Sequence, residues 1–126
     1  MSLRILIVDD SEVTRRILVT VVRSRRWTVC GEAEDGSSAI RKFQELLPDL
    51  ALVDLAMPDI NGIEVARVMH SVDPTAPIII FTVQDVEELK AAAHDAGVYD
   101  IISKGECWTL LTSIDKAIAQ SRGLIQ

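Results

Sequence analysis

The sequence predicts one α/β domain, a doubly wound sheet of five parallel strands flanked by five helices. Short apolar runs rich in Val and Ile, which are typical of strands buried on both faces, alternate with longer stretches in which apolar residues recur at helical spacing. Each stretch between two runs is long enough for the right-handed crossover that joins parallel strands. The chain has 126 residues, of which 48% are hydrophobic, and this suffices for one core. We expect the domain to cover residues 1–120, and residues 121–126 to be a tail or the start of a linker.

Five segments have the composition expected of the strands. They are residues 3–8, 27–33, 51–54, 77–81 and 99–103. Pairs of residues that favour turns or stop helices lie between several of these segments. They include Pro48-Asp49, Asn61-Gly62 and Asp73-Pro74. The alternation therefore continues from the first strand to the last helix without a repeat or an internal linker.

The first helix is expected to begin after Ser11, a good N-cap residue, with Glu12 in its first turn, where the helix dipole favours a carboxylate. The apolar residues expected on its core face are Val13, Ile17 and Val21, with Leu18 and Val22 beside them. Its arginines are Arg15, Arg16, Arg23, Arg25 and Arg26. These arginines are explained in part by the preference of helix C-termini for cations. A docking surface for an acidic partner is the alternative.

The last helix is expected to run from about Glu106. Its predicted inner face consists of Leu111, Ile114 and Ile118. Trp108 falls at the flank of this face, at roughly 100° of rotation per residue. Two interpretations of Trp108 are open: it lies at the edge of the core, or it is an exposed anchor for a partner.

Composition and charge exclude several classes of function. The net charge of −6 argues against direct binding of nucleic acid. The two cysteines, Cys30 and Cys107, form no CxxC pair, so we expect reduced, partly buried thiols and no zinc site. No apolar run approaches the roughly 18 residues of a membrane span, and no signal peptide is recognisable. A cytoplasmic protein that contacts neither membrane nor nucleic acid is the expectation.

Four of the predicted strands end at, or are directly followed by, residues with reactive or metal-binding side chains. Asp9 and Asp10 follow the first strand, Asp54 ends the third, Thr82 follows the fourth and Lys104 follows the fifth. In a parallel sheet all carboxyl ends of strands lie at one edge, which is where open α/β sheets bind ligands. We therefore expect three carboxylates, a hydroxyl and an ammonium to meet in one crevice.

The groups expected in this crevice suit phosphoryl transfer. Three carboxylates this close repel one another, and a divalent cation relieves the repulsion. Mg²⁺ takes oxygen ligands and needs only one or two carboxylates beside waters and a phosphate oxygen. Thr82 and Lys104 add donors for a phosphoryl oxygen. An Asp can then act as the nucleophile by forming an aspartyl phosphate.

This set of residues resembles the receiver domain of bacterial two-component response regulators, the CheY-like variant of the flavodoxin-like fold. The resemblance covers nearly the whole chain, from Ile5 to about Ala119. Its motifs are the acidic pair after the first strand, the Asp before Met57-Pro58 and Gly62, and the Thr and Lys after the last two strands. The match is specific because five positions agree in order and each lies at a strand end.

The resemblance implies roles at the acidic positions. Asp54 would be the phosphoacceptor. Asp10, Asp54 and the backbone carbonyl of Ala56 would hold Mg²⁺, and Asp9 would act largely through water. The domain would be a signalling switch rather than an enzyme with a separate substrate, although it would catalyse its own phosphorylation and dephosphorylation.

The resemblance also implies how the signal enters and leaves. The donor would be a phosphohistidine on a histidine kinase or a phosphotransfer protein. Lys104 would pair with the phosphoryl group, and Thr82 would turn to hydrogen-bond it. The output surface would lie at about residues 85–119. A dimer linked to phosphorylation is a further expectation.

Three positions depart from the pattern of the family. Ile101 stands where receivers usually carry Tyr or Phe, Gly105 replaces a common Pro, and Val83 replaces a small residue after the switch Thr. Isoleucine is stiff and has no polar tip, so we expect Thr82 and the segment after it to carry more of the coupling. Val83 is expected to narrow access to Asp54.

Three alternatives belong to other classes of protein. A phosphatase of the haloacid-dehalogenase kind needs a second Asp two residues after the nucleophile, where this chain has Ala56. A pseudo-receiver that only docks partners usually lacks the acceptor or the acidic pair, and both are kept here. A flavin-binding protein would need a phosphate-binding loop after the first strand. Asp59 is interpreted as a residue of the turn rather than as a ligand.

Overall fold

The alternation of strands and helices predicted from the sequence is confirmed by the computed structural model, which describes residues 2–123. The strands are β1 (Arg4–Val8), β2 (Thr28–Ala33), β3 (Leu50–Asp54), β4 (Ile78–Thr82) and β5 (Asp100–Ser103). The helices are α1 (Glu12–Ser24), α2 (Gly36–Leu46), α3 (Gly62–Val72), α4 (Val86–Asp95) and α5 (Leu110–Ser121). A short 3-10 helix, η1 (Lys104–Thr109), connects β5 to α5.

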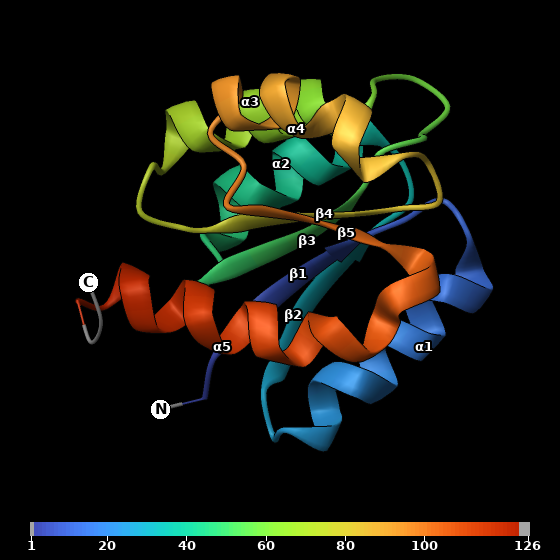
Figure 1. Ribbon diagram of the computed structural model, residues 1–126. Helices are drawn as coiled ribbons and strands as arrows, with labels where there is room; N and C mark the ends of the chain where they lie inside the picture. The colour runs from blue at the N-terminus through green and yellow to red at the C-terminus, as the bar shows by residue number, and fades with distance from the viewer. Residues whose placement is uncertain (1, 124–126) are drawn as a thin grey trace.

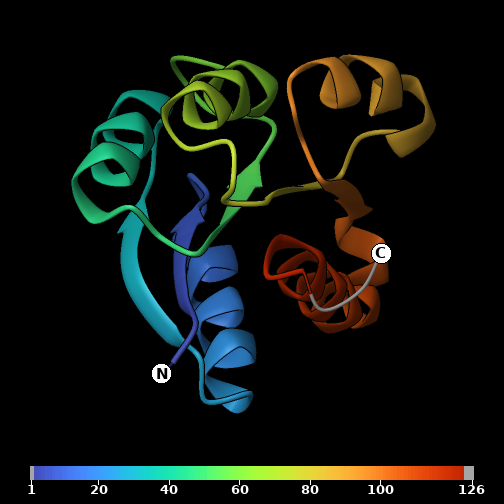
Figure 2. The ribbon, with the colours of Figure 1, turned by 90° about the vertical axis from the view of Figure 1, so that its left-hand side faces the viewer.

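The strands form one parallel sheet in the order β2-β1-β3-β4-β5. Helices α1 and α5 cover one face of the sheet, and α2, α3 and α4 cover the other (Figure 1 and Figure 2). From β1 the chain first builds β2 on one side and then returns to build β3 on the other. The direction of winding therefore reverses between β1 and β3, and ligands of open α/β sheets bind outside the carboxyl ends of the strands at such a reversal.

Each face of the sheet buries its own core. Leu18 and Val22 of α1 and Ile114 of α5 belong to the core on one face. Phe43 of α2 and Met69 of α3 belong to the core on the other. Successive residues of a strand point to opposite faces, so β3 and β4, which are buried along their whole length, are apolar up to Asp54 and Thr82. This is the pattern from which they were predicted.

The predicted core face of α1 is wrong by about one residue. Val13 and Ile17 are 68% and 56% exposed, whereas Leu18 and Val22 are buried. Both pairs have the i, i+4 spacing of one helix face, and the two faces are neighbours around the helix axis. Helical spacing alone does not decide between them. The choice is made by tertiary packing, in which Leu18 and Val22 meet the core shared with α5.

The last helix begins later than predicted, because η1 occupies residues 104–109 and α5 starts at Leu110. The backbone of Glu106 is non-helical, with φ −121° and ψ 42°. Trp108 is 72% exposed, so the interpretation that places it at the edge of the core is wrong. Cys107 is also exposed, against the expectation of a partly buried thiol. The fully buried side of α5 is shifted from the predicted one and consists of Leu110, Ser113, Ile114 and Ala117.

Smaller differences concern the ends of elements. Four strands begin one residue later than predicted, and β3 begins one residue earlier. α5 ends at Ser121, and residues 124–126 of the predicted tail lie outside the described residues. Among the helices of residues 2–123, none is both long enough and apolar enough to cross a membrane.

Candidate functional site at the carboxyl edge of the sheet

Sheet topology brings the predicted polar residues of β1, β3 and β5 together. Val8 of β1 lies opposite Val53 of β3, which sets Asp9 beside Asp54. Lys104, the first residue after β5, reaches past the end of β4 to both carboxylates. The convergence expected from a parallel sheet is therefore observed for these residues.

Two buried carboxylates share the ammonium of Lys104. Its Nζ donates a hydrogen bond to Oδ2 of Asp9 at 3.0 Å and lies 3.3 Å from Oδ1 of Asp54. Asp9 and Asp54 are 1% and 5% exposed. Asp10 adds a third, exposed carboxylate at the same edge. The negative charge of the cluster thus exceeds the positive charge that reaches it.

The carboxyl of Asp54 lies in surroundings that disfavour its charge. Burial, with the charge of Asp9 adding to it, raises the pKa of Asp54 from 3.8 to about 6, although Lys104 opposes the shift. Most of the carboxyl is still ionised at pH 7, so a nucleophilic oxygen is available. A pKa perturbed by burial and specific charges at a sheet edge marks a candidate for a functional residue.

The ammonium of Lys104 is held in its charged form. Burial alone would lower its pKa, but the hydrogen bond to Asp9 and the charges of Asp54 and Asp9 outweigh burial and raise the pKa above its ordinary value. Lys104 therefore remains a cation throughout the neutral pH range. A fixed positive charge beside Asp54 is suited to pair with an anionic group bound there.

The carboxylates fit a divalent cation. Oxygens of Asp9, Asp10 and Asp54 lie within 4.8 Å of one another. Asp9 already uses both of its oxygens, because Oδ1 accepts the N–H of Ser11 at 2.8 Å and Oδ2 accepts from Lys104. Asp10 and Asp54 thus offer the more open carboxylates. An all-oxygen set of this kind suits Mg²⁺, which binds through one or two carboxylates and keeps several waters.

A second cation, which no sequence motif predicted, holds Asp9 in place. Nη1 of Arg15 donates to the backbone carbonyl of Asp9 at 2.6 Å. The same guanidinium pairs with Glu32 of β2, where Nε lies 3.5 Å from Oε1. For Arg15 the explanation by the C-terminus of the helix is wrong, because the residue lies in the first turn of α1 and reaches back to β1. No motif in the sequence signals this contact, which depends on how α1 lies against the sheet.

The other predicted site residues are Thr82, which follows the β4 neighbour of Asp54, and Ala56, two positions after Asp54. Thr82 ends β4, is 1% exposed, and its Oγ1 accepts the N–H of Gln84 at 3.1 Å. The hydroxyl hydrogen of Thr82 can therefore serve another acceptor. Ala56 is exposed in the loop between β3 and α3. Val83 is 78% exposed, so its side chain projects into solvent.

The loop from Asp54 to α3 is tightly closed at its far end. The N–H of Gly62 donates to the carbonyl of Leu55 at 2.7 Å. A Cβ at position 62 would lie 2.3 Å from the backbone oxygen of Asp54, so only glycine permits this close approach. The Gly62 of the sequence motif thus has a steric reason: it lets α3 begin directly against the end of β3.

Asp59 ties the same loop to the start of α2. Its carboxylate accepts the N–H of Gly36 at 2.7 Å, the N–H and hydroxyl of Ser37 at 3.0 and 2.7 Å, and the N–H of Ile60 at 2.8 Å. The donors on α2 are end groups that have no partner within the helix. These hydrogen bonds, that of the Ser37 hydroxyl first, hold the pKa of Asp59 well below its ordinary value. Asp59 is a structural residue that acts across 23 positions as well as within its own turn.

Comparison with known proteins identifies the family. Residues 5–114 match the response regulator receiver domain. The chain is 36% identical over 104 residues to the chemotaxis protein CheY of Thermotoga maritima, covering 82% of this chain and 87% of that protein. The chain therefore belongs to the response regulator receiver domain family and is a receiver domain of the CheY type.

Solved structures share the fold. A CheY-like receiver domain protein from Methanospirillum hungatei has the same fold, with a TM-score of 0.91, 24% identity and coverage of 99% of this chain and 100% of that one. A chain of the CheX–CheY–BeF3–Mg²⁺ complex from Borrelia burgdorferi gives a TM-score of 0.86 at 25% identity, with coverage of 90% of this chain and 87% of that one. Receiver domains of this family act in two-component signalling and typically use Mg²⁺.

Proposed function

We propose that this domain is a phosphorylation-dependent switch in which Asp54 accepts a phosphoryl group from a phosphohistidine. The observation that carries the proposal is the position of Asp54, a buried and ionisable carboxylate 3.3 Å from the ammonium of Lys104 and beside two further carboxylates. The donor is a histidine kinase or a phosphotransfer protein. The relative from Borrelia, whose complex contains BeF3 and Mg²⁺, supports the same chemistry here.

In the proposed transfer, an oxygen of the ionised Asp54 attacks the phosphorus atom of the phosphohistidine. The bond from phosphorus to this oxygen forms as the bond from phosphorus to the imidazole nitrogen breaks, and the imidazole leaves with that electron pair. Lys104 is positioned to stabilise the negative charge on the phosphoryl oxygens. Mg²⁺, held by Asp10, Asp54 and the carbonyl of Ala56, supplies further positive charge when bound. Asp9 positions Lys104 through its 3.0 Å hydrogen bond.

The switch itself is assigned to Thr82 and the segment that follows it. In the described state, Thr82 Oγ1 accepts the N–H of Gln84. A phosphoryl oxygen on Asp54 offers the hydroxyl of Thr82 a strong acceptor, and a turn of Thr82 toward it shifts the start of α4. Ile101, at 9% exposure, is already packed under α4 and has no polar group that prefers solvent in one state. Phosphorylation therefore acts by changing the populations of two states of one fold.

The proposal is tested by weighing the intact protein after incubation with acetyl phosphate and Mg²⁺. Wild type should gain one phosphoryl group, and excess EDTA should prevent the gain. Asp54→Ala should gain none, whereas Asp59→Ala, a matched change five positions further on, should still be labelled. Labelling that persists in Asp54→Ala would refute the assignment. A wild type that never labels, with Asp54 intact and Mg²⁺ present, would favour a docking module without phosphotransfer.

A further inference from the structure

A basic groove lies at the amino edge of the sheet, at the opposite end of the strands from the candidate site. It has a volume of about 330 Å³ and is lined by the residues between α1 and β2, by the C-terminal half of α5, and by Ser2 and Leu3 before β1. Strands β1 and β2 begin at the same end of the molecule as the last turn of α1 (Figure 2). The groove shares no residue with the cluster of Asp9, Asp54 and Lys104.

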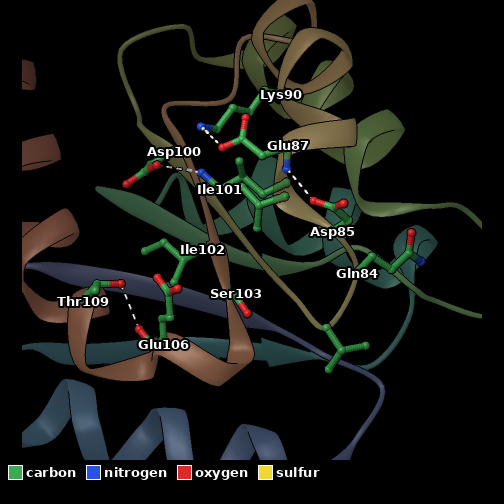
Figure 3. A pocket seen from close by; sticks show the side chains of 12 residues that line it. Gln84, Asp85, Glu87, Lys90, Asp100, Ile101, Ile102, Ser103, Glu106 and Thr109 are labelled. Atoms are coloured by element: carbon green, nitrogen blue, oxygen red, sulfur yellow. Dashed lines mark hydrogen bonds and ion pairs between the residues drawn. The ribbon is translucent and has the colours of Figure 1, made fainter.

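The charge of this groove is opposite to that of the chain. Its lining contains three arginines, Arg25, Arg26 and Arg122, and one carboxylate, Asp115. Three positive charges and one negative charge leave a net charge of +2, whereas the whole chain carries −6. A larger groove between α4 and η1 (Figure 3) is lined by four carboxylates and Lys90, and so is acidic like the chain. The amino-edge groove can therefore attract an anionic group that the protein as a whole repels.

The three arginines differ in how far they are already used. Nη1 of Arg25 donates to Oδ2 of Asp115 on α5 at 2.8 Å, and its guanidinium lies over the ring of Trp27, 5.7 Å from the ring centroid. Arg26 and Arg122 are exposed, and their guanidinium groups have no hydrogen-bond or ion-pair partner within residues 2–123. A guanidinium presents a planar fork of donors that matches a carboxylate. Arg26 and Arg122 are thus the groups available to an anionic ligand.

The backbone of Arg26 has a conformation that is unusual for a residue with a side chain. Its φ is 61°, in the left-handed region where glycine is the usual residue after a helix end. Its N–H donates to the carbonyl of Arg23 at 2.9 Å, and its carbonyl accepts the hydroxyl of Ser2 at 3.1 Å. A glycine would make both hydrogen bonds with less strain. The end of α1 therefore needs the backbone of Arg26 but not its guanidinium.

We propose that this groove binds an acidic segment of a partner protein. Asp or Glu side chains of the segment pair with Arg26 and Arg122, and an apolar side chain packs against Trp27 and Ile118. Charge complementarity selects an acidic segment over a basic one. Trp27 and Ile118, which are only partly buried, favour a peptide over a small anion, because a small anion would leave both uncovered. The proposal is independent of the proposed function of Asp54.

The experiment measures the anisotropy of a fluorescein-labelled peptide of alternating Glu and Leu residues with the whole domain. Two control peptides replace Glu by Gln or Leu by Ser, and both should bind about tenfold more weakly, since charge and apolar contact are both required. General attraction cannot produce binding of the Glu-Leu peptide, because the chain has a net charge of −6.

Arg26→Gly is the most informative variant. It removes the guanidinium and relieves the backbone, so binding should weaken about fivefold while Tm does not fall. Arg122→Gln should weaken binding to a similar extent. Arg67→Gln is the matched control and should bind as wild type does, because it removes one exposed arginine from α3, on the other face of the sheet (Figure 1). In Trp108→Phe the remaining tryptophan is Trp27, and its emission should change when the peptide binds.

Four results would overturn the proposal. The first is a wild-type domain that does not bind the Glu-Leu peptide, or binds it without a change in the emission of Trp27. The second is an equal loss in Arg26→Gly and Arg67→Gln, which would mean that the position of the arginine is irrelevant. The third is an Arg26→Gly protein with lower Tm and unchanged binding, which would show that the guanidinium serves the end of α1. The fourth is a dimer, seen by sedimentation without peptide, whose NMR shifts map to the groove.

Discussion

Asp54 ends β3 and Asp59 lies five residues further on in the loop that follows, yet their surroundings are opposite. Asp54 is 5% exposed, and burial with the charge of Asp9 raises its pKa to about 6. Asp59 is exposed and accepts four hydrogen bonds, which lower its pKa well below the ordinary value. One carboxylate is buried with too few donors, and the other is exposed with more donors than most surface carboxylates have.

The difference shows what separates a reactive carboxylate from a structural one. The charge of Asp59 is fully engaged by donors of α2 and its own loop, so a ligand would have to compete with four contacts already made. The charge of Asp54 is shared with one ammonium that also serves Asp9. A cation at Asp54 therefore relieves a repulsion that the fold leaves in place.

The largest effect expected on stability is that of Lys104→Ala. Its removal leaves two buried carboxylates without their cation, which should lower the free energy of unfolding by about 3 to 5 kcal/mol in EDTA. Mg²⁺ should restore much of the loss, because it supplies positive charge to the same carboxylates. Urea unfolding with and without Mg²⁺ measures both quantities. Lys116→Ala, at an exposed position of α5, is the control, and a loss that Mg²⁺ leaves unchanged would contradict this account.

Asp54→Asn should do the reverse and stabilise the metal-free protein at pH 7. The folded pKa of Asp54 is about 6 and the ordinary value is 3.8, so the folded state binds this proton more tightly than the unfolded chain does. The loss of stability caused by ionising Asp54 is absent below pH 3.8. It grows as the pH rises from 3.8 to about 6 and is complete above the folded pKa. Two pKa units correspond to at most about 3 kcal/mol.

Urea unfolding of wild type and Asp54→Asn from pH 4 to pH 8 in EDTA tests this expectation. The two proteins should be equally stable at the acidic end, and the variant should gain its advantage as the pH passes about 6. An Asp54→Asn variant less stable than wild type at pH 7 would contradict this expectation. It would show that the ammonium of Lys104 fully offsets the burial of the Asp54 charge and its repulsion by Asp9.

A smaller effect is expected at Asp59. Asp59→Ala should lower Tm, since the loop loses its tie to α2, and Ser37→Ala should lower it less, because the backbone N–H donors remain. The lowered pKa of Asp59 determines how its contribution to folding stability changes with pH. The contribution of Asp59 is present above its ordinary pKa of 3.8 and is lost as the pH falls through the lower folded pKa. Thermal unfolding of both variants at pH 7 and pH 3 measures this, and an Asp59→Ala protein as stable as wild type at pH 7 would refute the role.

The sequence was sufficient to predict the architecture and the convergence of Asp9, Asp54 and Lys104. Strands buried on both faces are recognisable as apolar runs, and a parallel sheet places their carboxyl ends at one edge whatever the details of packing. The position of Asp54 at the end of β3 follows from the same pattern. The functional roles proposed for these residues come from chemistry and family resemblance, and the experiments above test them.

Other features depend on tertiary contacts that leave no local pattern. The core face of α1 was mispredicted because Ile17 and Leu18 offer adjacent stripes, and only packing into the core shared with the sheet and α5 selects one. The contact of Arg15 with Asp9 and that of Asp59 with α2 depend on how elements far apart in sequence lie against each other. The exposure of Trp108 follows from η1, whose break at Glu106 the helical periodicity did not show.

The most direct test of the contrast between Asp54 and Asp59 is to locate the acyl phosphate. The protein is phosphorylated with acetyl phosphate and Mg²⁺, reduced with borohydride, which converts a phosphorylated Asp into homoserine, and sequenced by tandem mass spectrometry after digestion. The account predicts homoserine at position 54, with Asp9, Asp10 and Asp59 unchanged. Homoserine at position 59, or at either residue of the acidic pair with Asp54 intact, would contradict it.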